Sequence, residues 1–171
     1  MWSAKTKTEV EPQLRVMRIL TVALASGPLI FAAVAATVIP PPATPATMGQ
    51  IAGRPGMMMI GLFAFVSAIL MRRFVLKMLP MMARRSLPPT LPRGDRIIAF
   101  MTMMRTRLIV TSSILEGAAF FNIVCFMLER QVPSLGAGVL LALMILAQFP
   151  SMTSAEHFIE EQQLLLEQES R

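Results

Sequence analysis

The chain has 171 residues, of which 54% are hydrophobic and only 15% are charged. This composition excludes an ordinary soluble domain, in which about a quarter of the residues are charged. The net charge of +6 would suit a nucleic-acid-binding protein, but the basic residues lie beside apolar segments and are not interleaved with aromatic side chains. The single Cys125 excludes an intrachain disulfide and a multi-cysteine metal site.

The apolar residues are gathered in segments of membrane-spanning length, which predict an all-α polytopic membrane protein. A helix rises about 1.5 Å per residue, so about 20 residues cross a hydrocarbon core of about 30 Å. We expect four transmembrane helices in an antiparallel bundle, at about 16–39, 56–79, 107–129 and 134–150, within a membrane domain of residues 1–153. Residues 1–15 are polar and of mixed charge, and are expected to form a short tail.

The segments between the predicted spans are marked by proline and by short turns. Pro40-Pro41-Pro42 ends the first span, and residues 80–94 form a loop rich in proline and arginine. From Asp95, one or two interfacial helical turns are expected to lead into the third span. The short connection from Glu129 to Pro133 predicts a helical hairpin. A cleaved signal peptide is the alternative for the first segment, although its apolar stretch is long for one.

The last segment, residues 154–171, is predicted to be a cytoplasmic amphipathic helix. The sequence Thr153-Ser154-Ala155-Glu156 matches a capping box at its start. The helix is acidic, so it should avoid anionic lipid and is expected to dock on the basic loop or on a partner protein.

The distribution of basic residues predicts the orientation in the membrane. Thirteen of the sixteen Lys and Arg residues lie between Lys5 and Arg18 or between Arg72 and Arg107. Basic residues accumulate on the cytoplasmic side, so both termini are expected there, in a bacterial cytoplasmic membrane with anionic headgroups. The residues predicted to contact lipid headgroups are Arg72, Arg73, Lys77, Arg84, Arg85, Arg105 and Arg107.

Glu116 is the main candidate for a functional residue, because it lies near the middle of the third predicted span. It is about 13 Å of helix from Arg107, and an ionisable residue at that depth marks a functional site by default. Ser112 and Ser113 precede it by one turn, where their hydroxyls could hydrogen-bond the carboxyl of an ion-binding site. Two further polar residues, Asn122 and Gln148, are predicted to pack inside the membrane.

Residues 107–129, and above all the sequence SILEGAAFFNIVCFML that follows the basic loop, resemble the ion-carrying second helix of the proteolipid c subunit of rotary ATP synthases. In that family a carboxylate in the middle of the helix is followed by small residues and then by an aromatic and aliphatic run. The resemblance implies that Glu116 stands at the position of the ion-carrying carboxylate. It covers 23 of the 171 residues, and two of the predicted spans have no counterpart in that two-helix family.

Two functions therefore remain open. With a neutral Glu116 hydrogen-bonded at a helix interface, the protein would be a structural or interaction subunit of a membrane assembly, as a homo-oligomer or with a membrane-protein partner. Alternatively, Glu116 would carry a proton or cation across the membrane.

Other chemistry is not expected. The sequence has no phosphate-binding glycine loop, His/Cys cluster or nucleophile–base pair, so neither enzymatic activity nor a cofactor is predicted. The sixteen methionines would suit Cu(I), but methionine is also an adaptable apolar filler and His157 is isolated, so no metal site is predicted.

Overall fold

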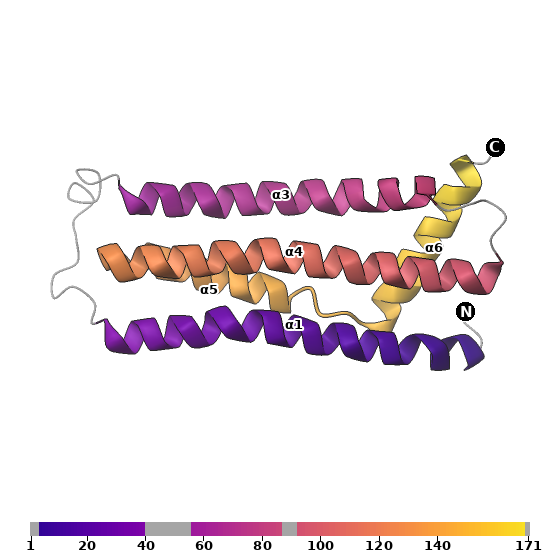
Figure 1. Cartoon of the computed structure of the whole chain (residues 1–171), viewed down its shortest axis with the longest axis horizontal. Helices are drawn as coiled ribbons and strands as arrows, with labels where there is room; N and C mark the ends of the chain where they lie inside the picture. Colours follow the sequence, from indigo (N-terminus) through magenta and orange to yellow (C-terminus); the bar gives the residue numbers. More distant parts are fainter. Residues whose placement is uncertain (1–3, 40–55, 87–91, 170–171) are drawn as a thin grey trace.

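The computed structural model describes residues 4–39, 56–86 and 92–169, and every regular element within these ranges is a helix. The helices are α1 (Ala4–Val38), α3 (Met57–Ser86), α4 (Arg93–Glu129), α5 (Val132–Leu146) and α6 (Met152–Glu169). Four of them run side by side along one axis, and α6 crosses one end of the bundle obliquely (Figure 1). The predicted all-helical fold is confirmed.

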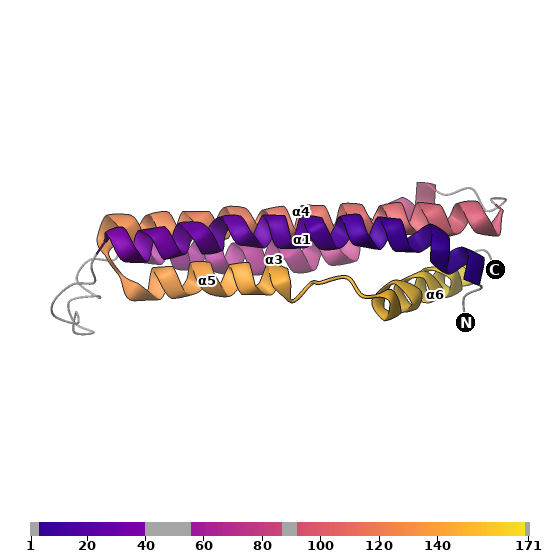
Figure 2. The same cartoon turned by 90° about the horizontal axis from the view of Figure 1, so that it is seen from below.

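α4 is the central helix of the bundle. It contacts α1, α3, α5 and α6, and in Figure 1 α1 and α3 lie on opposite sides of it. The start of α1 and the end of α6 lie at the same end of the bundle, which we call the terminal end (Figures 1 and 2). The opposite end, where α4 turns into α5, is called the hairpin end.

Three helices contain apolar stretches that are long enough to cross a membrane: Val10–Val38, Met58–Met82 and Gly94–Glu129. The fourth apolar helix, α5, has only 15 residues. It rises about 22 Å, which is less than a hydrocarbon core of about 30 Å. The fold therefore supports a membrane protein with three helices of spanning length and a shorter apolar helix packed beside them.

At the terminal end the helices extend beyond the predicted spans. Residues 4–15, expected to form a short tail, are helical and make up the first turns of α1. The cause is a helical stripe of apolar residues, Val10, Leu14 and Met17, each no more than 2% exposed because it packs against other helices.

The region around the predicted loop 80–94 also differs from the prediction. α3 continues through Pro80 to Ser86, and α4 begins at Arg93. The interfacial turns expected from Asp95 and the third span are one helix of 37 residues. A helical run that packs along its whole length against a neighbour has no reason to break at the charged residues within it.

α6 is held at the terminal end by a cluster of large apolar side chains, which we call the terminal core. Its members are Val10, Leu14, Met17, Phe100, Met101, Met103, Ala155, Phe158 and Ile159. The acidic helix thus docks on its own chain through its apolar face. The predicted capping box is wrong, because α6 already begins at Met152, and the side chain that caps it is Ser151, whose Oγ accepts the Ser154 N–H at 3.1 Å.

The helical hairpin between α4 and α5 is formed as predicted. Arg130 ends α4 in the left-handed conformation (φ 56°), and its N–H donates to the Phe126 carbonyl at 2.6 Å. Pro133 lies in the first turn of α5, where its missing N–H costs nothing.

α5 ends at Leu146, four residues before the predicted end at 150. The chain then runs without helix through Pro150 to α6, as Figure 2 shows. Arg18 fastens this connection to α1, because its Nε donates to the Pro150 carbonyl at 3.1 Å.

In the middle of the bundle the helices meet at small residues. A Cβ atom added to Gly138 of α5 would lie 2.8 Å from Ile123 Cγ1 and 3.0 Å from the Ala119 carbonyl oxygen of α4. A Cβ atom added to Gly61 of α3 would lie 2.9 Å from Asn122 Oδ1. Close approach at small residues is the usual way in which helices pack within lipid.

Candidate functional site

Glu116 lies on the side of α4 that faces α1. Its carboxyl is next to Gly27, where an added Cβ would be 3.7 Å from Glu116 Oε1 and 3.3 Å from Phe120 Cζ. Phe120 in turn packs on Phe31 of α1, with ring centroids 5.6 Å apart. Gly27 therefore leaves room for the carboxyl and the Phe120 ring. The Glu116 side chain is only half-buried, so part of it lies at the surface of the bundle.

The two serines before Glu116 have different environments. Ser112 Oγ is buried and has no hydrogen-bond partner within the described parts of the chain. The hydrogen bond predicted from Ser112 to Glu116 is therefore not formed. Ser113 is exposed, and so is Gly117, which lies one turn further along the same face. No atom lies within 4 Å of a Cβ added to Gly117. This face of α4 is free of the other described helices.

Asn122 is 1% exposed and lies between α4 and α3. Its Nδ2 donates to the Ala118 carbonyl at 2.9 Å, and its Oδ1 lies against Gly61. Cys125 Sγ lies beside the same glycine, at 3.6 Å from an added Cβ. The amide is therefore a polar packing group at the α3–α4 contact and does not share a site with Glu116.

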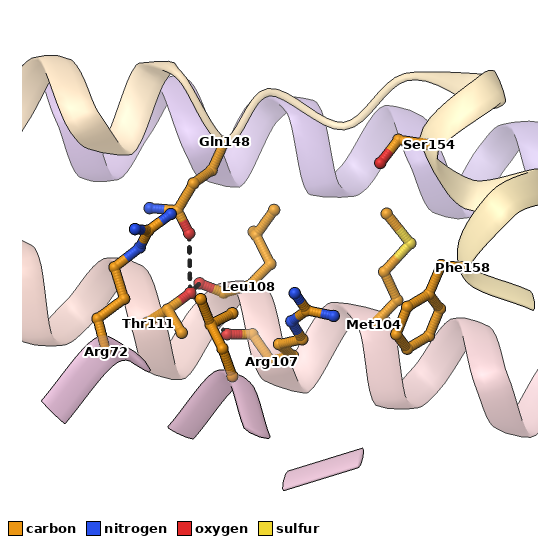
Figure 3. Close-up of a pocket in the computed structure, with 9 residues that line it drawn as sticks. Arg72, Met104, Arg107, Leu108, Thr111, Gln148, Ser154 and Phe158 are labelled. Atoms are coloured by element: carbon orange, nitrogen blue, oxygen red, sulfur yellow. Dashed lines mark hydrogen bonds between the residues drawn. The ribbon is translucent and has the colours of Figure 1, made fainter. Parts of the chain in front are cut away.

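Gln148, which follows α5, forms a hydrogen bond with α4 on the side of Glu116 that is nearer the terminal end. The Thr111 hydroxyl donates to Gln148 Oε1 at 2.9 Å (Figure 3). Gln148 Nε2 donates to the Met144 carbonyl at 3.2 Å. Thr111 is fully buried. This pair fixes the end of α5 against α4.

A cavity of about 190 Å³ lies beside this pair, where α5 has ended and α6 has not yet begun. Arg72 of α3 and Arg107 of α4 line it, together with Thr111, Gln148 and Ser154, and both arginine side chains point toward the segment that joins α5 to α6 (Figure 3). The Nε of Arg72 is buried without a hydrogen-bond partner among the described residues. The guanidinium of Arg107 lies 5.4 Å from the centre of the Phe158 ring.

The other predicted headgroup residues whose side chains are described do not line this cavity. Arg73, Lys77 and Arg105 are exposed. Arg84 is half-buried and donates from Nη1 to Gln162 Oε1 of α6 at 2.8 Å. The side chain of Arg85 lies outside the described part of the structure.

Several residues of these sites are not evident from the sequence. Gly27 faces Glu116 across 89 positions of the chain, and Thr111 and Ser154 have no pattern that marks them as cavity residues. Glu129 is a further case: its Oε2 accepts the Met58 N–H at 3.0 Å and so caps the start of α3. In the sequence, the role of Glu129 could be inferred only from its position: it ends the third predicted span, on the same side of the membrane as the expected start of the second span.

The candidate site thus consists of two separate parts, a half-buried carboxyl at the α1–α4 contact and a cavity with two arginines nearer the terminal end. The described residues contain no group of three or more His, Cys, Asp or Glu side chains that could hold a metal ion. Comparison of the chain with protein-family models, with curated proteins and with solved structures finds no match.

Proposed function

We propose that the protein is a small integral membrane protein that acts as a structural or interaction subunit of a membrane assembly, with Glu116 at a helix–helix interface. The observation that carries the proposal is the partial burial of the Glu116 carboxyl at the middle of the apolar part of α4. A polar group exposed to hydrocarbon costs free energy, and a packed neighbouring helix removes that cost.

The surface beside Glu116 supports this proposal. Ser113 and Gly117 are both exposed and lie four residues apart, which is the small-xxx-small spacing that lets a second helix approach closely. A helix seated on this face would contact the open side of Glu116. The occupant is a helix of a second copy of the chain or of another membrane protein.

The test compares two open glycines. Gly117 on α4 and Gly136 on α5 both have no atom within 4 Å of an added Cβ. Gly117→Ile should abolish association, measured as the oligomeric state in mild detergent and as cross-linking from a photoreactive group at Ser113 in the membrane. Gly136→Ile should leave both unchanged. A monomeric wild type without a cross-linked partner would disprove the proposal.

The membrane orientation belongs to the same proposal. The protein resides in a bacterial cytoplasmic membrane with both termini in the cytoplasm, and α5 together with the residues after it completes a fourth crossing. The terminal end carries most of the basic residues, whereas Arg130 lies at the hairpin end, in the direction that the positive-inside rule favours. Single cysteines at Gln131 and Ser151, in a Cys125→Ser background, should be labelled from outside and from inside, respectively. The reverse labelling would overturn this orientation.

Translocation of a proton or cation by Glu116 is the second candidate function. One observation favours it: the buried Ser112 hydroxyl has no partner among the described residues and lies one helical turn from Glu116, toward the cavity. The Ser112 hydroxyl could hydrogen-bond a water molecule that connects the cavity with the Glu116 carboxyl.

A flux assay separates the two functions. If Glu116 carries ions, Glu116→Gln should assemble normally but abolish proton or cation movement in proteoliposomes, because the amide keeps the shape and cannot exchange the proton. If Glu116 is an interface group, Glu116→Gln should change little, whereas Glu116→Leu should weaken association. Absence of flux in wild type would remove the transport function.

A further inference from the structure

We propose that the cavity between Arg72 and Arg107 binds a phosphate group, that of an anionic phospholipid whose headgroup enters between α3, α4 and the start of α6. This inference does not rest on the proposed function, because binding of a lipid to the isolated protein needs no partner subunit.

The position of the two arginines along their helices supports a headgroup. Arg72 directly follows the apolar segment 57–71 of α3, and Arg107 directly precedes the mainly apolar segment 108–128 of α4, in which Glu116 lies. Because the two helices pack side by side, both side chains lie at the level where the hydrocarbon ends. Basic pockets between membrane helices at this level are known to take anionic headgroups.

The electrostatics of the cavity favour an anion. Arg72 and Arg107 line the same cavity, and the charge of Arg72 disfavours that of Arg107, a repulsion that a phosphate between them would relieve. Glu161 of α6 attracts Arg107 more strongly than Arg72 repels it, but it is exposed to water and supplies one negative charge against two positive charges. The two cations therefore retain an excess of positive charge toward the cavity.

The geometry of the cavity also fits a phosphate. Its volume of about 190 Å³ exceeds that of several water molecules at about 30 Å³ each. The Nε of Arg72, buried without a partner among the described residues, is a donor for a phosphate oxygen, and the Arg107 guanidinium lies over the Phe158 ring at 5.4 Å from its centre. The hydroxyl of Ser154 lines the same space (Figure 3).

The cavity has an apolar wall as well. Leu76, Met104, Leu108 and Phe158 line it alongside the polar groups. A free phosphate ion gains nothing from these side chains, whereas the glycerol and first methylenes of a phospholipid would bury against them. The mixed lining therefore favours a lipid headgroup over inorganic phosphate.

The cavity exists because α5 stops early. The bundle continues toward the terminal end as α1, α3 and α4, while α5 gives way at Leu146 to a connection without helix. One or two further turns of α5 would place side chains where the cavity now lies. The arginines consequently face a space that none of the described helices fills.

The test is a titration of purified protein in mild detergent with dioctanoyl phosphatidylglycerol, dioctanoyl phosphatidylcholine and inorganic phosphate, followed by native mass spectrometry and by the shift in unfolding temperature. Phosphatidylglycerol should bind saturably and raise the unfolding temperature. Arg72→Gln and Arg107→Gln should each weaken this binding by about tenfold or more, the usual effect of losing a charge-assisted contact.

Arg73→Gln and Arg105→Gln are matched controls, because they remove the same charge from exposed neighbours. They should change the affinity by less than about twofold, as expected for exposed charges. Equal losses in all four variants would overturn the site and leave only a diffuse attraction of basic residues to anionic lipid. Equal binding of phosphatidylcholine would overturn the selectivity for an anion. Equal binding of inorganic phosphate would overturn the lipid as its source.

A further variant tests the cavity without a change of charge. Ser154→Trp would fill the space between α5 and α6 while both arginines remain, and it should abolish lipid binding if the cavity is the site. Its unfolding temperature without lipid, compared with that of wild type, shows whether the bundle is intact. Full binding by a folded Ser154→Trp protein would disprove the proposal even if the arginine variants fail to fold.

Discussion

The terminal core is filled by large side chains such as Phe100 and Phe158, whereas the middle of the bundle is held together where Gly61 and Gly138 let α3 and α5 approach α4. Two solvents account for this difference. Burying a phenylalanine from water is strongly favourable, so the part of the bundle that carries most of the charged residues gains stability from large apolar side chains. Within lipid, burial of an apolar side chain gains little, so close contact at small residues takes its place.

The comparison is tested most strongly by removing a large side chain from the terminal core. Phe100 is 0% exposed, and Phe100→Ala should lower the free energy of unfolding by about 3–5 kcal/mol. The measurement is reversible unfolding in mixed micelles, followed by circular dichroism. Phe121→Ala on the same helix is the control, because Phe121 is 39% exposed and faces outward, and it should have a much smaller effect. Similar losses from both variants would mean that the two regions do not differ in their source of stability.

The second test adds volume in the middle of the bundle. Gly138→Val places a side chain where Ile123 and the Ala119 carbonyl already lie within 3.0 Å of an added Cβ. We expect a loss of about 1–3 kcal/mol, typical of an overpacked interface. Gly136→Val on the same helix has open space around it and should be nearly neutral. A tolerated Gly138→Val would show that the α4–α5 contact does not depend on close approach.

A third prediction concerns Glu129, which caps the start of α3 and so joins α4 to α3 by a polar contact at the hairpin end. Glu129→Ala removes the acceptor of the Met58 N–H and should destabilise the bundle by about 1 kcal/mol. Glu129→Gln keeps an oxygen acceptor but loses the charge that favours a helix N-terminus, worth about 0.3–1 kcal/mol. Hydrogen exchange at the Met58 amide should accelerate in the order wild type, Gln, Ala. Unchanged exchange in both variants would refute the cap.

The smallest expected effect is a gain. Arg130 adopts the left-handed conformation, which is strained for a residue with a side chain. Arg130→Gly should therefore stabilise the hairpin by about 0.5–1 kcal/mol, after allowance for the greater chain entropy of glycine. Gln131→Gly, at a residue with φ of −87°, has no strain to relieve and should destabilise slightly. A loss of stability in Arg130→Gly would indicate that its side chain matters more than its backbone conformation.

The sequence predicts the helices themselves better than their ends. Apolar segments of spanning length and the turn between Glu129 and Pro133 are local patterns, and the structure contains the corresponding helices. The helical start of α1 could not be predicted from its polar composition. It depends on the burial of Val10 and Leu14 by α4 and α6, more than 80 residues away in the chain.

The same limit applies to the candidate sites. The unusual depth of Glu116 is evident from the sequence, but its neighbour Gly27 is determined by the way in which α1 packs on α4. Among the six predicted headgroup residues whose side chains the structure describes, only Arg72 and Arg107 line the cavity, and the reason is the early end of α5. Pro150 comes four residues after that end, and Ala147 and Gln148 between them form only a turn. The position of the proline alone therefore does not predict where α5 ends.

α4 is long and is not interrupted by proline, so it can transmit a tilt along its whole length. Its 37 residues contain no proline, whereas α1 has Pro12 and Pro28 and α3 has Pro80. At about 55 Å, α4 is longer than a hydrocarbon core of about 30 Å, so about 25 Å of it projects beyond that core. An unbroken helix of this kind behaves as a lever: a tilt of about 10° in the membrane would carry the projecting tip sideways by roughly 4 Å. α6 packs on this projecting part of α4 through Phe100 and Met101. A partner that tilts α4 within the bilayer would therefore also displace α6 at the terminal end.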